Sequence, residues 1–376
     1  MPDPVSGHQE QKPLTSIRGI AALWVVGSHL AGPLQPMLPA WLYAALHVGY
    51  MAVDVFFVLS GFILALVYRH LIVAQIPMFF AKRLARVYPL NIVLTTVMAA
   101  FAAAGMPPGI WQHWRTLPWF YTMMEAFIPE PVMAWILTSW SVGIEVLCYL
   151  SFPVLLLAFR RLPLVPLLAV VGVAVAAEYW VQTRYLAMFF SVGALIRGMG
   201  GFGLGVALGL LAPRLRRPSA VLVSVGEVLC VAAFGVAVAW DVLRFLPFAA
   251  AGLILLLYFG NGAVARGLHG RFFFWQGQIS YSVYMLHGPL LADWMHYGDL
   301  FGAWVLNPFA LARHMPTGAA VLCSAVPFVA VISLLATLTW RFVEQPGRRL
   351  PGLIGRRRPA AAVSALAHPA LTAEKL

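Results

Sequence analysis

The sequence has little charge and very few acids. Only 10% of its 376 residues are charged, and 13 acidic residues stand against 25 lysines and arginines. A water-soluble domain carries about 25% charged residues, so this composition excludes a protein whose whole surface faces water. The hydrophobic share of 61% and the mean hydropathy of +0.84 indicate a chain that crosses a membrane many times. We therefore predict an all-α, polytopic transmembrane helical bundle.

Cysteine is also scarce, with three residues in the chain. Cys148, Cys230 and Cys323 lie inside apolar stretches, and their spacing is not that of metal ligands. An odd number of such residues argues against a disulfide framework and indicates small buried side chains. The sequence has no HExxH motif or comparable cluster, so we predict no metal site and a metal-free mechanism.

The formal net charge is +12, but the basic residues are scattered through short loops between apolar runs. This pattern is typical of cytoplasmic loops that face anionic lipid, and it argues against nucleic acid as a partner. The clusters fall in alternate loops, which predicts that both termini are cytoplasmic. They contain Arg69, Lys82, Arg83, Arg86, Arg160, Arg161, Arg214, Arg216, Arg217, Arg266, Arg271, Arg348 and Arg349.

Apolar windows of about 20 residues, the length that crosses the hydrocarbon layer, predict about ten membrane spans. The sixth is the weakest, because it is short and rich in glycine. We expect one transmembrane domain over 14–346, between a cytoplasmic tail over 1–13 and a basic, then alanine-rich, disordered cytoplasmic tail over 347–376. The predicted spans are 14–33, 48–68, 87–105, 136–158, 164–180, 196–212, 220–239, 244–259, 279–297 and 318–340.

The longest loop, 106–135, is rich in aromatic residues and proline. Such a composition favours an aromatic belt at the outer headgroup level, where amphipathic rings settle. The alternative is a lid or a platform for an acceptor substrate. The aromatic residues are Trp111, Trp114, Trp119, Phe120 and Tyr121.

Two ionisable residues lie in the first apolar run, IRGIAALWVVGSHL. Such groups are costly inside a membrane and are usually retained for function. Arg18 and His29 are eleven positions apart, which is three helical turns plus about 20°, so both side chains lie on one face, roughly 16 Å apart along the axis. We expect both to point toward the same interior.

A carboxylate in the second span also needs an explanation. Asp54 lies several turns from either end of the run GYMAVDVFFVLSGFIL, where an unpaired charge is expensive. We expect its partner to be His29, Arg18 or water.

Two later spans carry polar stripes. Ser141 and Glu145 are four residues apart, and hence on one helix face. Ser280, Tyr284 and His287 follow the spacing i, i+4, i+7 along another helix. Each group alone is as well explained by hydrogen bonds between helices. Together with the His, Arg and Asp described above, they predict a shared polar site inside the bundle.

Three basic residues precede the third predicted span, in FFAKRLARVYPL. Arg83 and Arg86 are one helical turn apart and form a fork that suits phosphate oxygens, and Lys82 adds a third charge. A nucleotide-like carrier with a pyrophosphate and a 3′-phosphate fits such a fork. The alternative is an ordinary topology determinant at the membrane edge.

The motifs RGIAALWVVGSHL, VDVFFVLSGFIL, AKRLARVYPL, SWSVGIE, ISYSVYMLH and RFVEQPGRR resemble, in order and spacing, the signature blocks of the acyltransferase 3 family. These are bacterial membrane-bound O-acyltransferases that modify sugars and peptidoglycan. The resemblance covers residues 14 to 346, and its most specific element is the Arg, ten residues, His spacing of Arg18 and His29. It implies a bundle of about ten transmembrane helices that takes an acyl group, often acetyl, from cytoplasmic acyl-CoA.

The resemblance also implies roles for individual residues. It assigns catalysis to His29 and Arg18, donor binding to Arg83 and Arg86, and a site lined by Glu145 and Tyr284. Some relatives carry an appended hydrolase-like domain, which we do not expect in this chain. The acyl group would then be handed to a carbohydrate hydroxyl within the bundle.

The chemistry of the residues is compatible with acyl transfer. The reaction needs a base for the hydroxyl proton and donors for the developing oxyanion, and imidazole titrates near neutrality. His29 is the candidate base, with Asp54 or Glu145 to orient its ring. Arg18 would polarise the thioester carbonyl or bind a donor phosphate. An acyl-histidine intermediate, with His29 as the nucleophile, is the alternative route.

We therefore predict an O-acyltransferase of the bacterial inner membrane, with acetyl-CoA or another acyl-CoA as co-substrate and no permanently bound cofactor. Its acceptor would be a cell-envelope polysaccharide, an exopolysaccharide or a glycoside. The alternative is a proton-coupled transporter or flippase of a sugar-linked substrate, because interior acids and histidines also serve transport. The candidate acceptor-binding residues are Trp140, Ser141, Tyr284 and His287.

Overall fold

The computed structural model describes residues 11–104, 114–128, 135–136, 138–185, 191–297 and 317–355. This part of the chain is helical and contains no β-strand. The α-helices are α1 Lys12–Leu34, α2 Ala40–His47, α3 Ala52–Val67, α4 Ile76–Ala103, α5 Leu117–Thr122, α6 Trp140–Phe159, α7 Leu164–Tyr185, α8 Ser191–Leu211, α9 Ala220–Ala239, α10 Leu246–Phe259, α11 Ala263–Gly267, α12 Arg271–Tyr297, α14 Thr317–Thr339 and α15 Gln345–Gly355. Short 3-10 turns are η1 Gln35–Met37, η2 Val48–Met51, η3 Val73–Gln75, η4 Trp114–Thr116, η5 Glu125–Phe127, η6 Ala212–Arg214 and η7 Leu243–Phe245, and Trp340–Glu344 is π-helical.

Every predicted span falls on a helix, because a backbone in hydrocarbon must satisfy its hydrogen bonds within its own segment. Within the described residues, 8 helices are long and apolar enough to cross a membrane, and Leu243–Phe259 is a shorter apolar helix. The count of ten spans and the cytoplasmic position of both termini stay predictions. The predicted tail starts inside α15, which continues to Gly355, and residues 356–376 lie outside the described part.

The helix that contains the third predicted span begins at Ile76, well before residue 87. Pro77, in the first turn of α4, suits a helix start because its missing N–H group would have no partner there. The basic fork of Arg83 and Arg86 therefore lies on the helix itself, and not in the loop before it. Both side chains consequently have a fixed direction.

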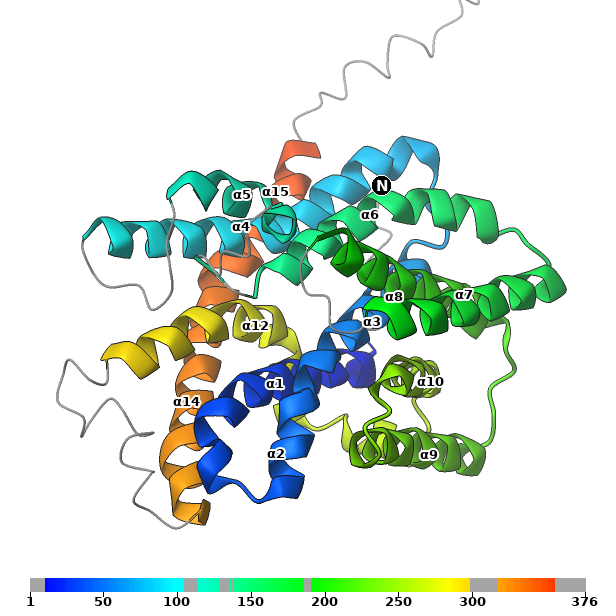
Figure 1. The fold of residues 1–376 in the computed structure, drawn as a ribbon. Helices are drawn as coiled ribbons and strands as arrows, with labels where there is room; N and C mark the ends of the chain where they lie inside the picture. The colour runs from blue at the N-terminus through cyan, green and yellow to red at the C-terminus, as the bar shows by residue number, and fades with distance from the viewer. Residues whose placement is uncertain are drawn as a thin grey trace, which may run out of the picture.

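The helices form one bundle, with α14 on one side and α7 and α9 on the opposite side (Figure 1). α3 packs against α8, and α1 packs against α12. The buried apolar side chains of these four helices belong to one large core that also includes residues of α4 and α6. The candidate site lies within this central part.

Glycines let α3 and α8 approach closely. A Cβ atom on Gly205 would lie 2.0 Å from the carbonyl oxygen of Val58, and one on Gly61 would lie 2.1 Å from that of Phe202. Small residues at such positions are typical of helix contacts in membranes. Glycines that made the sixth predicted span a weak candidate are therefore residues through which α8 packs against α3.

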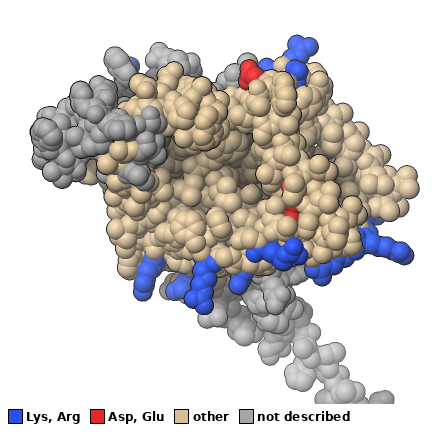
Figure 2. All heavy atoms as spheres, turned by 90° about the horizontal axis from the view of Figure 1, so that it is seen from below, with Lys and Arg blue, Asp and Glu red and all other residues tan. Residues whose placement is uncertain are grey.

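Exposed charged residues are unevenly distributed over the surface. Figure 2 shows Lys and Arg gathered along one edge, while the broad face beside it is almost free of charge. This distribution is the one expected of a bundle with an apolar belt and basic loops on one side of the membrane.

Part of the aromatic segment packs onto the bundle through α5. The side-chain amide of Asn91 on α4 donates to the carbonyl oxygen of Phe120 at 2.8 Å, and the Tyr88 hydroxyl donates to that of Tyr121 at 2.6 Å. Trp114 and Trp119 are exposed, whereas Trp111 lies outside the described residues. The aromatic belt and the lid both stay predictions.

Candidate active site

A cleft at the centre of the bundle brings together several of the predicted residues. Its empty volume is about 690 Å³, including space that opens to solvent. It is bordered by α1, α3, α4, α6 and α12. Its polar lining consists of Arg18, Ser60, Arg83, Arg86, Ser141, Glu145, Ser280, Tyr281 and Tyr284, and its apolar lining of Val53, Phe56, Phe57, Leu59, Ile63, Leu64 and Val142.

Three guanidinium groups and one carboxylate face this cleft, so cationic groups are in excess. Arg83 donates to the Tyr68 hydroxyl at 3.1 Å, and its guanidinium lies 5.2 Å from the centre of the same ring. Within the described residues, Arg18 and Arg86 form no hydrogen bond or ion pair. Their donors are available to an anionic ligand.

Glu145 is held by two hydroxyl groups. Ser60 on α3 and Tyr149, one turn further along α6, both donate to its Oε1 atom at 2.7 Å. In the described part of the chain nothing donates to Oε2. The carboxylate therefore has a fixed orientation and one open oxygen. The sequence analysis missed Ser60 and Tyr149, although the i, i+4 spacing of Tyr149 from Glu145 was a signal for the second.

Tyr284 on α12 lines the cleft. Its hydroxyl lies 2.6 Å from the Ser141 hydroxyl in a hydrogen bond between α12 and α6. Its ring packs edge-on against Phe56 with a centroid distance of 6.0 Å. On its other side the ring of His287 lies 5.6 Å away. Tyr284 thus belongs to both the cleft and the histidine region next to it.

His29 and His287 form a direct pair. The Nδ1 atom of His29 lies 3.0 Å from the Nε2 atom of His287, and the ring centroids are 4.9 Å apart. The Nδ1 atom of His287 lies 2.6 Å from the backbone carbonyl oxygen of Tyr284. His287 is fully buried and His29 is half-buried.

Arg18 and His29, which we expected to point toward the same interior, have different surroundings. Arg18 lines the cleft, whereas His29 does not. The roughly 16 Å between two side chains eleven residues apart on a helix places them at different levels of the bundle. Tyr284 lies between these two levels, because it lines the cleft and contacts His287.

The expected partners of Asp54 also require a correction. Arg197 on α8 donates to both of its carboxylate oxygens, from Nε at 2.8 Å and from an Nη atom at 2.7 Å. Both side chains are about 1% exposed. Asp54 therefore neither pairs with Arg18 nor orients His29, whose Nδ1 atom faces His287 instead. The sequence analysis missed Arg197, although an ionisable residue inside an apolar run was a signal for it.

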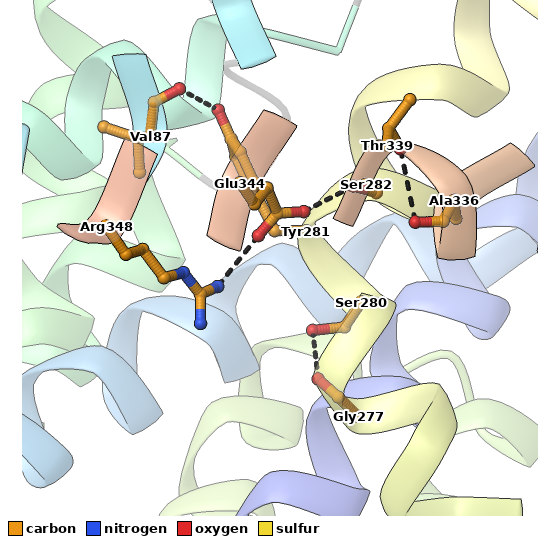
Figure 3. A network of polar contacts seen from close by, with 9 residues as sticks. All are labelled: Val87, Gly277, Ser280, Tyr281, Ser282, Ala336, Thr339, Glu344 and Arg348. Carbon is orange, nitrogen blue, oxygen red and sulfur yellow. Dashed lines mark hydrogen bonds and ion pairs between the residues drawn. The ribbon is translucent and has the colours of Figure 1, made fainter. Parts of the chain in front are cut away.

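A second polar network connects α12 to α4 and to the residues that follow α14. Figure 3 shows Glu344 between Arg348, which donates to it at 2.8 Å, and Ser282, which hydrogen-bonds to its other oxygen. The neighbouring Tyr281 hydroxyl donates to the Val87 carbonyl on α4 at 2.7 Å. Arg348, which the sequence analysis counted as a topology charge, thus forms an ion pair with a buried carboxylate, while its own side chain stays partly exposed. These contacts fix the helix that carries Tyr284 and His287.

Other predicted residues do not line the cleft. Lys82 and Trp140 are absent from its lining, although Trp140 is buried at the start of α6. Ser280 lines it, but its hydroxyl donates to the Gly277 carbonyl of its own helix at 2.8 Å. Over the described residues, no group of three or more His, Cys, Asp or Glu is placed to hold a metal ion.

Comparison with known proteins finds a family that this chain matches. The acyltransferase domain model of the acyltransferase 3 family matches residues 14–338. Acyltransferase MdmB of Streptomyces mycarofaciens is 28% identical over 93% of this chain and 93% of its own length. Protein 2 in picA locus of Rhizobium radiobacter is 44% identical over 91 residues, which are 23% of this chain and 44% of that protein. No solved structure matches.

The matched region includes α1, α3, α4, α6 and α12, the helices that border the cleft. It also contains His29, His287 and the three cleft arginines, so the polar site lies within the region that the family shares. This chain belongs to the acyltransferase 3 family and is an acyl-transferring enzyme with membrane-spanning helices.

Proposed function

We propose that this enzyme moves an acyl group, in the simplest case acetyl, from cytoplasmic acyl-CoA to a hydroxyl group of a carbohydrate-containing acceptor. The observation that carries the proposal is the cleft whose lining contains three guanidinium groups and a single carboxylate. Such an excess of arginine favours a ligand with several phosphate oxygens. CoA carries a pyrophosphate and a 3′-phosphate on the same molecule as the thioester.

The donor would be held by arginines on two helices. Arg83 and Arg86 lie one turn apart on α4 and direct their donors into the cleft, which suits the phosphates. Arg18 on α1 has its donors available to polarise the thioester carbonyl or to hold a further phosphate. Either role stabilises negative charge in surroundings where such interactions are strong.

His29 would supply the base. Its Nε2 atom takes the proton of the acceptor hydroxyl, the hydroxyl oxygen attacks the thioester carbonyl carbon, and the C–S bond breaks with CoA leaving as the thiolate. In the acyl-histidine route the same Nε2 atom attacks first and then passes the acyl group to the hydroxyl. Both routes require a lone pair on Nε2. In both, the thioester end of the donor would lie near Tyr284, which lines the cleft and contacts His287.

The acceptor class and the cellular location rest on the family resemblance. An envelope polysaccharide, an exopolysaccharide or a glycoside would present the hydroxyl group, and the enzyme would lie in a bacterial inner membrane. The acceptor-binding residues proposed are Trp140, Ser141 and Tyr284, of which the last two line the cleft.

The test is transfer of radiolabel from acetyl-CoA to glycans in membrane vesicles that contain the enzyme. Transfer should disappear in His29→Ala and persist in His269→Ala, a control histidine that is exposed. Mass spectrometry of glycans from cells with and without the enzyme should find the added acyl group. Movement of a sugar-linked substrate across vesicles without acyl-CoA would instead support the transporter.

A further inference from the structure

The proton positions of the two histidines can be derived from their partners. A backbone carbonyl oxygen only accepts hydrogen bonds, so the Nδ1 atom of His287, 2.6 Å from the Tyr284 carbonyl oxygen, carries a proton. His287 is fully buried, and within the described residues no carboxylate contacts its ring. A buried cation without a counter-charge is expensive, so the ring is neutral and its Nε2 atom offers a lone pair.

The proton position of His29 follows from the same argument. Its Nδ1 atom lies 3.0 Å from the Nε2 lone pair of His287 and therefore donates its proton there. The backbone carbonyl of Val25 is a second acceptor near His29. It also accepts from the Ser28 hydroxyl at 2.7 Å, and its two lone pairs accommodate both donors. A hydrogen bond from Nδ1 of His29 to this carbonyl requires a proton on the same nitrogen. A neutral imidazole with a proton on Nδ1 has its free lone pair on Nε2. This is the atom that the proposed transfer requires.

We propose that His287 is a positioning residue that selects the reactive tautomer of His29, the part that a carboxylate plays in hydrolase triads. This inference rests on the proposed function and deepens it. When His29 Nε2 takes up the hydroxyl proton, its Nδ1–H donates more strongly to His287, because the donor is then charged. The Tyr284 carbonyl polarises His287 in the same direction, so the chain of hydrogen bonds supports the imidazolium without burying an anion.

Close packing of α1 and α12 maintains the pair. Gly19 precedes His29 by ten residues, and Gly277 precedes His287 by ten. A Cβ atom on Gly19 would lie 2.6 Å from the backbone of Gln276, so nothing larger than glycine fits without moving the helices apart. The two helices are therefore in close contact at these glycines, and the two imidazoles meet ten residues further along each helix.

The decisive variants are His287→Gln and His287→Asn. The Gln amide oxygen reaches the position of Nε2 and still accepts the proton of His29, but the Tyr284 contact is lost. The shorter Asn keeps a donor for the Tyr284 carbonyl but does not reach His29. The two variants are matched in polarity and differ in which half of the chain of hydrogen bonds they retain.

The first measurement does not depend on transfer activity. Solid-state NMR of histidine-labelled enzyme in lipid, with the His29 signals identified by their loss in His29→Ala, reports which ring nitrogen carries the proton. We expect Nδ1 in the wild type and in His287→Gln, and a shift toward Nε2 in His287→Asn. A wild-type His29 protonated on Nε2, or an Asn variant with unchanged signals, would overturn the inference.

The second measurement is the kinetics of acyl transfer. We expect His287→Asn to lower kcat by about 10²- to 10⁴-fold, as loss of the correct tautomer does in a triad, while the KM for acyl-CoA is unchanged. His287→Gln should recover at least about tenfold of that loss. Equal losses in both variants, or a raised KM with normal kcat, would make His287 a structural or substrate-binding residue. If the wild type transfers nothing from acyl-CoA, the proposed function fails, while the NMR result still decides the tautomer.

Discussion

Arg197 binds both carboxylate oxygens of Asp54 across the contact between α8 and α3, although 143 residues separate the two in the chain. Neither side chain reaches solvent, at about 1% exposure each. Two opposite charges that share two hydrogen bonds are tolerated at this depth, whereas either one alone would not be. The pair joins α3 and α8 next to the glycines that already bring their backbones together.

We expect Asp54→Asn to destabilise the enzyme by about 3 to 5 kcal/mol, because it leaves the guanidinium of Arg197 buried without a counter-charge. Thermal unfolding in detergent or lipid nanodiscs measures the loss. Removing both charges in Asp54→Asn/Arg197→Gln should recover much of it, since the variant effects of a contacting pair are not additive. An Asp54→Asn enzyme of normal stability that no longer transfers acyl groups would instead support the catalytic role first suggested for Asp54.

The second prediction concerns donor binding. Arg86→Gln should raise the KM for acetyl-CoA by about 10- to 100-fold, the loss expected from removing one hydrogen bond to a charged group, about 1.5 to 3 kcal/mol. Arg83→Gln should act in the same direction. The matched control is Arg216→Gln, since Arg216 is exposed and lies in the loop after α8, away from the cleft.

A donor analogue locates the phosphate that is bound. If Arg86 holds the 3′-phosphate, acetyl-dephospho-CoA should show the raised KM with the wild type and no further rise with Arg86→Gln. A normal KM for acetyl-CoA in both arginine variants would count against the cleft as the donor site.

The third prediction concerns the contact between α3 and α8. Gly205→Ala should destabilise the enzyme by about 1 to 3 kcal/mol, because the added methyl group would meet the Val58 carbonyl oxygen, 2.0 Å from its ideal position. Gly203→Ala in the same helix should be neutral or stabilising, since nothing lies within 4 Å of its added carbon and alanine favours helix. Thermal unfolding of the two variants side by side tests the close approach. Equal stability of both would contradict it.

The fourth prediction concerns pH and Glu125, which lies outside the membrane-spanning helices. Its side chain is 3% exposed, its oxygens have no partner among the described residues, and the neighbouring Ser139 hydroxyl donates to Ile136 instead. Removal from water raises the pKa of Glu125 from its ordinary 4.5 to about 7. The folded state therefore binds more protons than the unfolded state between these two values.

The free energy of unfolding should accordingly fall as the pH rises from 4.5 to 7, by up to about 3 kcal/mol from this group. The stabilising contribution of Glu125 is complete below about pH 4.5 and is lost above about pH 7. Glu125→Gln, which is always uncharged, should remove this part of the pH dependence and be more stable than the wild type at alkaline pH. Chemical unfolding at a series of pH values measures the difference, and parallel curves for both proteins would refute the prediction.

Composition and hydropathy were sufficient for the helical class and for the approximate positions of the long apolar helices. A segment such as 220–239, for which the helix Ala220–Ala239 is found, is readable because hydrocarbon permits only one local backbone structure. Boundaries were less readable where an apolar run continued into basic residues, as at Ile76, because a helix can extend beyond the hydrocarbon layer without any change in local structure.

The motifs were also sufficient for the family and for most of the polar lining of the cleft. Arg18, Arg83, Arg86, Ser141, Glu145 and Tyr284 were named from their residue types, their spacing and the family resemblance, and all line the cleft. Spacing was informative because a helical period of 3.6 residues determines which side chains share a face.

Only the tertiary structure decided which faces meet. From the sequence we expected Asp54 to pair with His29, Arg18 or water, but its partner is Arg197. We also expected an acid to orient His29, but the side chain next to its Nδ1 atom is that of His287, 258 residues away. One helix fixes the direction of its own side chains and nothing about the helix opposite. That choice depends on how closely glycine-lined backbones such as α1 and α12 approach, which is a property of the packed bundle.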